Sequence, residues 1–277
     1  MSSLAGKVVL ITGGAQGVGA EVAHRLHARN AKLVLTDLQD EPLKKIGAQL
    51  GGDERVLTVV ADVCDPAAMQ SAVDQAVSHF GGLDVVVANA GIFHYGSVLG
   101  SDPAAFKRVI DIDVVGVVNT VRAALPAIIQ RRGYVLIVSS LAAYAAAPGM
   151  TAYDTAKAAV EQFANALRLE VVDRGVAVGS AHMSWLDTPM VRNAKAEMCS
   201  FRDMVARLPW PLNVTTSVDK CGAAFVKGIE GRKSHIYCPE WVAVFRWLRP
   251  LLALPPVEYI VAKRALEPLT RMDAERR

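Results

Sequence analysis

The chain has 277 residues, of which 52% are hydrophobic and 21% are charged, as expected for a globular protein with a sizeable core. Its formal net charge is only +3, and no Lys/Arg-rich stripe runs along it. Because nucleic-acid-binding domains concentrate basic charge on one face, we expect no nucleic-acid partner.

The cysteines and the first apolar segment bear on the compartment. The four cysteines are scattered, without Cys-x-x-Cys spacing or paired histidines beside them. This pattern disfavours a zinc site and a disulfide framework, so we expect no metal and a reducing, cytoplasmic environment. The first apolar run, residues 8–11, is too short for a secretory signal, and no uncharged stretch reaches the roughly 18–20 residues of a membrane span.

The first predicted element is a buried strand at residues 8–11, which is β-branched and continuously apolar. It runs into a glycine-rich turn at residues 13–19, followed by a helical segment at residues 20–29. Gly13, Gly17 and Gly19 at such a turn let the backbone approach a pyrophosphate, whose charge lies at the helix N-terminus. The alternative is a loop that merely requires glycine, but the flanking strand and helix favour phosphate binding.

The second predicted strand, residues 32–36, ends at Asp37, which Leu38 follows. A carboxylate about 20 residues after the glycines can accept hydrogen bonds from the adenosine ribose and repel a 2′-phosphate. Ala15 and Gln16 are not basic, and no arginine follows Asp37 directly, so the sequence favours NAD over NADP. The alternative is that Asp37 only begins a surface turn.

Strands and helices continue to alternate along the chain. Predicted helices cover residues 41–50, 67–80, 103–131 and the segment around Tyr153, and predicted strands cover residues 56–60, 85–88, 134–139 and 176–181. This alternation predicts an α/β fold with a Rossmann-like, doubly wound parallel sheet, in which ligands bind beyond the carboxyl ends of the strands. Three strands lead into candidate motifs: Asp62-Val63, Asn89-Ala90-Gly91 and Ser139-Ser140. No linker interrupts the pattern, so we expect a single catalytic domain at residues 1–239 with an extension at residues 240–277.

Tyr153 and Lys157 lie four residues apart in a segment rich in helix formers. Side chains at positions i and i+4 share one helix face, so the phenol and the ammonium can meet. A nearby ammonium favours the ionised phenol and lowers the pKa of the tyrosine toward values useful for proton exchange near neutrality. For this motif alone, a solvated surface pair is the alternative.

Together the motifs resemble the short-chain dehydrogenase/reductase family, in its order and spacing from about residue 5 to about residue 190. The resemblance is carried by Thr12-Gly13-Gly14-Ala15-Gln16-Gly17-Val18-Gly19, Asp62-Val63, Asn89-Ala90-Gly91, Ser140 and Tyr153-Asp154-Thr155-Ala156-Lys157. It implies hydride transfer between NAD and an alcohol or ketone, with Tyr153 as the acid/base, Lys157 lowering its pKa, and Ser140 holding the substrate oxygen. The cofactor-binding residues that we expect are Gly13, Gln16, Gly17, Val18, Gly19, Asp37, Leu38, Asp62, Val63, Asn89, Ala90, Gly91, Tyr153, Lys157 and Thr188.

Asp113 departs from the family pattern. It stands where the family normally has an active-site Asn, whose main-chain carbonyl holds a water in a proton relay. Any residue supplies that carbonyl, so we include Asp113 among the catalytic residues. An ionised carboxylate there raises the pKa of Tyr153 relative to Asn, which predicts retained activity with an alkaline-shifted pH optimum. The alternative is that Asp113 faces a structural partner and changes nothing.

A second departure follows the strand at residues 176–181, where the family usually has Pro-Gly and this chain has His182-Met183-Ser184-Trp185. Thr188 keeps its place, so the resemblance implies an intact contact to the nicotinamide carboxamide. His182 can be interpreted as a catalytic base, although a strand-end histidine is more often structural. Trp185 adds a large apolar surface near the site.

Residues 190–215 are expected to form the substrate lid, because this insertion varies most within the family. Apolar side chains of the lid and of neighbouring loops suit a lipophilic substrate such as a steroid, terpenoid or long-chain lipid, although some must be ordinary core. They are Met190, Met198, Phe201, Met204, Leu208, Trp210 and Leu212 in the lid, and His94, Tyr95, Leu141, Tyr144 and Met150 beside it.

The C-terminal segment is apolar and aromatic at residues 241–254, and from Arg232 onward it holds nine Lys/Arg against five Asp/Glu. Basic residues beside Trp, Phe and Leu fit an interfacial helix on an anionic membrane surface, a possible peripheral membrane contact. The simpler interpretation, which we favour, is that the tail packs over the substrate mouth or against another subunit.

An alcohol dehydrogenase or carbonyl reductase is the leading functional hypothesis. Its rival is a non-catalytic dinucleotide sensor or scaffold, which has no need of Ser140, Tyr153 and Lys157 together and is favoured only by Asp113. An epimerase or dehydratase is disfavoured by the compact length and by the form of the glycine loop. The family usually forms dimers or tetramers through two long helices, and the apolar residues at 114–121 and 159–167 offer surface for a homodimer or homotetramer.

Overall fold

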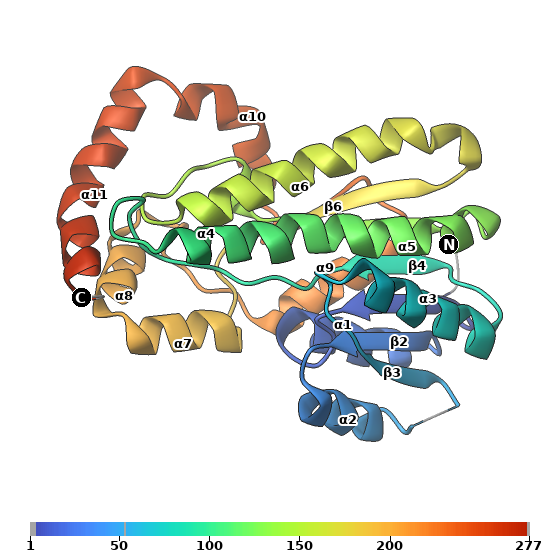
Figure 1. Ribbon diagram of the computed structural model, residues 1–277. Coiled ribbons are helices and arrows are strands. Elements are labelled where there is room, and N and C mark those ends of the chain that lie inside the picture. Colours follow the sequence, from blue (N-terminus) through green and yellow to red (C-terminus); the bar gives the residue numbers. More distant parts are fainter. Residues whose placement is uncertain (1–3, 53, 276–277) are drawn as a thin grey trace.

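The computed structural model describes residues 4–52 and 54–275, which form a three-layer α/β fold around one sheet (Figure 1). Seven parallel strands lie in the order β3-β2-β1-β4-β5-β6-β7. They are β1 (Val8–Thr12), β2 (Lys32–Asp37), β3 (Val56–Val60), β4 (Val85–Ala88), β5 (Tyr134–Val138), β6 (Ala177–Met183) and β7 (His235–Cys238). The strand order reverses between β1 and β4, the switch point at which such sheets bind ligands. The predicted doubly wound parallel sheet is confirmed.

Helices cover both faces of the sheet, because successive side chains of a strand point to opposite faces. In β1, Val9 and Ile11 pack beneath the first helical layer, and Val8 and Leu10 beneath the second. The first layer holds α1 (Gly17–His27), α2 (Asp40–Gln49) and α9 (Val218–Glu230), and the second holds α3 (Pro66–Phe80), α5 (Gly116–Gln130) and α6 (Thr151–Glu170). Val117, Val121 and Leu167, which the sequence also offered for subunit contacts, belong to the buried core of the second layer.

Local sequence signals set the ends of several helices, as α3 illustrates. The Asp65 carboxylate accepts a hydrogen bond from the Ala67 N–H at 2.8 Å, and Pro66 occupies the first turn, where its missing N–H costs nothing. Gly81 ends the helix at φ 79°, a left-handed conformation that glycine adopts without a steric penalty. These signals fix both ends of α3, after which the chain leads into β4.

The segment predicted as one helix at residues 103–131 has three parts. A π-helical turn, Asp111–Val115, separates α4 (Pro103–Ile110) from α5, a break that the apolar periodicity does not reveal. Among the described residues, this run is the one helix long and apolar enough to cross a membrane by length and composition, although charged residues such as Asp113 and Arg122 interrupt it, so it contains no uncharged stretch of that length. Half of its most apolar window is buried inside the fold, as in the core helix of a globular domain.

The lid and the C-terminal segment lie together at one end of the molecule (Figure 1). The lid contains α7 (Pro189–Glu197) and α8 (Cys199–Arg207), and the C-terminal segment contains α10 (Val242–Leu252) and α11 (Pro255–Glu275). α11 lies beside α8, and its Met272 is fully buried in a cluster with Tyr95, Met150 and Phe201. Neither β7 nor α11 was predicted from the sequence, because β7 has no continuous aliphatic run and the apolar residues of α11 do not line up on one face.

Candidate active site

A cavity of about 550 Å³ opens beyond the carboxyl ends of the central strands. Every predicted site residue except Gly19 lines it: Gly13, Gln16, Gly17, Val18, Asp37, Leu38, Asp62, Val63, Asn89, Ala90, Gly91, Asp113, Ser140, Tyr153, Lys157 and Thr188. Gly19 lies inside α1, behind the glycine-rich turn. The fold therefore gathers residues from widely separated segments around a single space.

The glycine-rich turn has the shape of an anion cradle. Gly13 and Gly17 adopt φ values of 63° and 58°, and a Cβ atom on Gly19 would lie 2.2 Å from the Gly13 carbonyl oxygen, so only glycine fits there. The first turn of α1 contains no acidic residue, and Gln16 does not cap the helix with its side chain. The first backbone N–H groups of α1 are thus open to an anion. These features fit the pyrophosphate of a dinucleotide.

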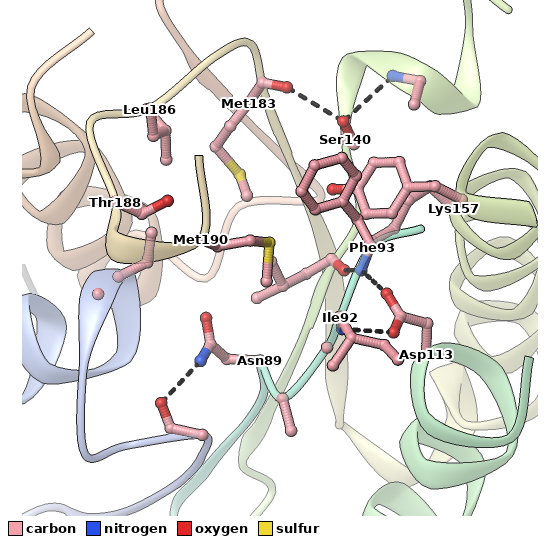
Figure 2. A pocket seen from close by; sticks show the side chains of 18 of the residues that line it. Asn89, Ile92, Phe93, Asp113, Ser140, Lys157, Met183, Leu186, Thr188 and Met190 are labelled. Atoms are coloured by element: carbon pink, nitrogen blue, oxygen red, sulfur yellow. Dashed lines mark hydrogen bonds and ion pairs between the residues drawn. The ribbon is translucent and has the colours of Figure 1, made fainter. Parts of the chain in front are cut away.

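Asn89 ties this turn to the neighbouring strand. Its amide nitrogen donates to the Gly13 carbonyl at 3.2 Å (Figure 2). The same nitrogen donates to the Thr12 carbonyl at 2.9 Å, and the Asn89 backbone N–H donates to the Thr12 hydroxyl. The resemblance implied that this motif lines the cofactor ribose. The contacts show that the Asn89 side chain also holds the glycine-rich turn in place.

Two carboxylates border the expected adenosine end of the cavity. Asp37, at the end of β2, accepts hydrogen bonds from the Ala15 N–H at 3.1 Å and from the Leu38 N–H at 2.9 Å. Asp62 accepts one from the Cys64 N–H at 2.8 Å. Asp37 thus joins β2 to the glycine-rich turn and forms part of the cavity wall, so it does more than begin a surface turn.

Tyr153 and Lys157 meet as the i, i+4 spacing predicts, and they are not a solvated surface pair, because Lys157 is buried and Tyr153 is half-buried. The Lys157 ammonium lies 5.3 Å from the centre of the Tyr153 ring and donates to the Val138 carbonyl at 3.2 Å. Burial raises the pKa of the phenol, Lys157 and Ser140 lower it, and Asp113 raises it, so that the pKa lies above its ordinary value. The expected lowering of the pKa is therefore wrong in its net direction, because burial and Asp113 outweigh the ammonium.

Asp113 forms a buried ion pair with Lys157, with 2.9 Å between Oδ2 and Nζ, while Oδ1 accepts a hydrogen bond from the Ile92 N–H at 2.7 Å (Figure 2). Its side chain is fully buried, and burial raises the pKa of the carboxyl even though Lys157 lowers it. The ion pair in turn raises the pKa of Lys157, although burial alone would lower it. A Cβ atom on Gly91 would come within 2.9 Å of Oδ2, so glycine is required where the carboxylate approaches. Asp113 thus has a structural partner, and this partner is the predicted catalytic lysine.

Ser140 follows β5 and begins a 3₁₀ turn, Leu141–Ala143. Its hydroxyl accepts a hydrogen bond from the Ala142 N–H at 3.2 Å and donates to the Met183 carbonyl at 3.3 Å (Figure 2). Ser139 is fully buried and donates to the Lys157 carbonyl, in agreement with its expected packing role. Both serines line the cavity, but the Ser139 hydroxyl is bound to Lys157 at 2.9 Å, whereas the Ser140 hydroxyl has only longer hydrogen bonds that a substrate oxygen can replace.

His182 is a structural residue and not a base. It is fully buried in β6, where its ring contacts the Tyr144 hydroxyl at 3.0 Å, the Ser180 hydroxyl at 2.9 Å and the Ser140 carbonyl at 3.2 Å. Burial lowers the pKa of His182 to about 3, so its ring is neutral at physiological pH. Its contact with the Ser140 carbonyl holds the serine turn from behind.

The substrate side of the cavity is largely apolar. Its walls include Phe93, Leu141, Met150, Trp185, Met190, Leu208 and Leu212. The sequence analysis did not identify Phe93 and instead named its neighbours, His94 and Tyr95, as pocket residues. In the structure, Tyr95 is buried in the cluster under the lid, and His94 contacts the Ser101 hydroxyl. Met198, Phe201 and Met204 also belong to that cluster, and Trp210 is 81% exposed. The prediction of an apolar pocket thus holds for Leu141, Met150, Trp185, Met190, Leu208 and Leu212, while Phe93 is an addition.

Thr188 begins α7, and its hydroxyl accepts a hydrogen bond from the Val191 N–H at 3.3 Å. It therefore caps the first lid helix while lining the cavity. Asp154, which the sequence did not single out, lines the cavity next to Tyr153. Burial raises its pKa to about 7, and its Oδ2 accepts a hydrogen bond from the Ala147 N–H at 2.8 Å.

The doubly wound sheet, the anion cradle and the Ser140–Tyr153–Lys157 group define a dinucleotide-dependent oxidoreductase that acts on CH–OH groups. The family model described as "short chain dehydrogenase" matches residues 7–198. The chain therefore belongs to the short-chain dehydrogenase family.

Named relatives and solved structures agree with this assignment. The putative oxidoreductase SadH of Mycobacterium tuberculosis is 38% identical over 204 residues, which cover 70% of this chain and 72% of the relative. The 11-beta-hydroxysteroid dehydrogenase 1A of Arabidopsis thaliana is 32% identical over 256 residues, covering 87% of this chain and 71% of the relative. A 3-ketoacyl-(acyl-carrier-protein) reductase from Brucella melitensis, complexed with NADH, has a TM-score of 0.76 and 26% identity over 85% of this chain and 97% of its own. A Burkholderia phymatum short-chain dehydrogenase/reductase in complex with NAD shares the fold, with a TM-score of 0.79 and 22% identity over 92% of this chain and 98% of its own.

Proposed function

We propose that this protein is an NAD-dependent oxidoreductase that interconverts a lipophilic secondary alcohol and its ketone, with Tyr153 as the acid/base. The observation that carries the proposal is the convergence of Ser140, Tyr153 and Lys157 on one cavity that also contains the glycine-rich anion cradle. When a nicotinamide is bound, it gives a hydride to the ketone carbon or takes one from the alcohol carbon. The protein residues handle the proton and orient the substrate.

In the reduction direction, the Tyr153 phenol donates its proton to the carbonyl oxygen as the hydride adds to the carbon. The Ser140 hydroxyl donates a second hydrogen bond to the same oxygen and stabilises its developing negative charge. Because burial keeps the pKa of Tyr153 above its ordinary value, the phenol is protonated at neutral pH and ready to donate. Oxidation of the alcohol is the reverse, with the phenolate accepting the hydroxyl proton.

Asp37 supports a preference for NAD. Its carboxylate lies at the cavity wall, joined to the glycine-rich turn through the Ala15 N–H, where it can accept hydrogen bonds from the adenosine ribose. A phosphate on that ribose would face the negative charge of Asp37. Ala15 and Gln16 supply no compensating cation.

The apolar substrate side supports a lipophilic substrate. Phe93, Met150, Trp185, Leu208 and Leu212 present large apolar surfaces around the expected position of the reacting oxygen. The similarity to a hydroxysteroid dehydrogenase is in keeping with a rigid apolar alcohol such as a sterol.

One observation favours a second candidate, a dinucleotide-binding sensor without catalysis. The Asp113–Lys157 ion pair neutralises the ammonium on which the tyrosine depends. If this neutralisation keeps Tyr153 from exchanging protons, the chain binds the dinucleotide and does no chemistry.

The test is nicotinamide absorbance during incubation with NAD or NADP and a panel of steroid, terpenoid and fatty secondary alcohols, and with the reduced cofactors and the matching ketones. Tyr153→Phe is compared with Tyr259→Phe, which removes a hydroxyl from an exposed tyrosine that does not line the cavity. We expect turnover with NAD that Tyr153→Phe abolishes and Tyr259→Phe preserves. NAD binding by calorimetry without turnover on any substrate would favour the sensor, and turnover that survives Tyr153→Phe would contradict the assigned acid/base.

A further inference from the structure

The two C-terminal helices carry an apolar surface that the substrate site does not use. α10 and α11 meet at the edge of the molecule and stand away from the sheet (Figure 1). Six large apolar side chains around this corner are between 47% and 77% exposed, and we call them the apex surface. They are Val244, Trp247, Leu251, Leu254, Tyr259 and Ile260.

α10 is apolar on two sides, although only one of them is covered by the domain. Val242 is fully buried, and Phe245 is partly buried and contacts the Trp241 ring. Val244, Trp247 and Leu251 follow the i, i+3, i+7 spacing of a single helix face, and this face is exposed. A surface helix normally turns polar residues outward, so a second apolar face indicates a further apolar partner.

The corner between the helices is a formed structure. The Leu254 carbonyl accepts hydrogen bonds from the Val257 N–H at 2.9 Å and from the Glu258 N–H at 3.0 Å, which close the turn. Arg249 pairs with Glu161 of α6 at 3.3 Å and holds α10 on the body of the molecule. Because the apex surface is already ordered, little conformational entropy is lost when it binds a partner.

The charges around the apex surface are mostly positive. Between residues 241 and 264 there are four basic residues, Arg246, Arg249, Lys263 and Arg264, against one acidic residue, Glu258. Lys263 and Arg264 are exposed, and neither forms an ion pair with another described residue. The partner that complements this surface is therefore apolar in its interior and anionic at its boundary.

We propose that the apex surface inserts into the interface of an anionic lipid membrane. Trp247 and Tyr259 are the residue types that favour the headgroup level of a bilayer, and the basic residues match anionic lipids. A symmetric contact between two copies of this chain fits less well, because it sets the same cationic rim against itself. The surface lies on the helix pair that continues to the lid, where Met272 of α11 packs under α8, so the bound protein holds its lid near the membrane.

The test is co-sedimentation of the full chain with phosphatidylcholine vesicles, with and without phosphatidylserine. We expect pelleting that depends on phosphatidylserine and falls in high salt. Trp247→Ser with Leu251→Ser should abolish it, and Lys263→Glu with Arg264→Glu should weaken the partition coefficient by at least about fivefold for each basic residue lost. These side chains are exposed, so unchanged thermal melting will show that the variants remain folded.

Two matched controls separate the apex surface from general stickiness. Leu99→Ser removes a fully exposed leucine elsewhere on the molecule, and Lys44→Glu with Lys45→Glu reverses an adjacent pair of exposed lysines on α2. Both should pellet like the wild type. Equal pelleting with neutral and anionic vesicles, or no loss in the Trp247/Leu251 variant, would overturn the proposal. The proposal would also be overturned if the Trp247/Leu251 variant pelleted like the wild type and differed only by a lower molecular mass in light scattering. The apex surface would then bind a second copy of the chain. None of these readouts needs turnover, so the result stands apart from that of the activity assay.

Discussion

The Asp113–Lys157 ion pair makes a prediction about the pH dependence of catalysis. In Asp113→Asn, the buried ammonium loses its negative partner, and Tyr153 faces an uncompensated positive charge. A positive charge favours the phenolate, so the pKa of Tyr153 should fall. The limb of the pH–rate profile that reports loss of the phenol proton should move to lower pH.

The size of this shift follows from the geometry. The Asp113 Oδ2 atom lies 2.9 Å from the Lys157 ammonium, which lies 5.3 Å from the centre of the Tyr153 ring, so the carboxylate is at most about 8 Å from the ring. At an effective dielectric constant of about 20, one charge at about 8 Å contributes roughly 2 kcal/mol. With about 1.4 kcal/mol for each pKa unit, we expect a downward shift of between one and two units.

The assay is kcat/KM for NAD-dependent alcohol oxidation across the pH range in which both proteins stay folded. The matched control is Asp111→Asn, which removes a carboxylate from the same π-helical turn where it is half-exposed and paired with Lys107. The pH–rate profile of Asp111→Asn should coincide with that of the wild type. Loss of a buried partner can cost about 3–5 kcal/mol of stability, so thermal melting of Asp113→Asn must accompany the kinetics. Superimposed wild-type and Asp113→Asn profiles from folded proteins would refute the electrostatic role.

Three further predictions follow from other contacts. Asp37→Ser removes the charge that would face a 2′-phosphate. It should raise the ratio of kcat/KM for NADP to kcat/KM for NAD by roughly tenfold or more, which corresponds to about 1.4 kcal/mol. An unchanged ratio would contradict the role assigned to Asp37. The pKa of Asp154 is about 7 in the folded protein and 3.8 as a free group, so the folded state binds this proton more tightly than the unfolded state. The folded state therefore loses stability as the pH rises from about 4 through 7, by up to about 4 kcal/mol. Asp154→Asn should therefore raise the melting temperature more at pH 8 than at pH 4, and an equal gain at both would count against this pKa. Met272→Ala empties a fully buried site between α11 and the lid, and it should cost about 2–5 kcal/mol in urea unfolding and speed amide exchange in α8; unchanged exchange there would show that α11 does not support the lid.

The sequence alone determined the features that depend on short stretches of chain. The β-branched run before Gly13 predicts a buried strand, and the glycines after it predict an anion cradle, because strand, turn and helix each have a local signature. Tyr153 and Lys157 meet because the helical repeat places i and i+4 on one face. The resemblance to the family rests on the same local motifs in a set order.

Only the tertiary structure decided which distant residues meet and how deeply they are buried. Asp113 and Lys157 come from different helices, and their pairing depends on how α6 packs beside the π-helical turn. The direction of the Tyr153 pKa shift depends on the balance between burial and two opposite charges, which spacing along the chain does not contain. Phe93 reaches the cavity and Tyr95 does not. The sequence does not reveal this difference, because the loop after β4 has no periodic pattern that assigns its side chains to one side. Local propensity acts over a few residues, whereas burial and charge pairing are summed over the whole fold, and this sum sets the chemistry of the site.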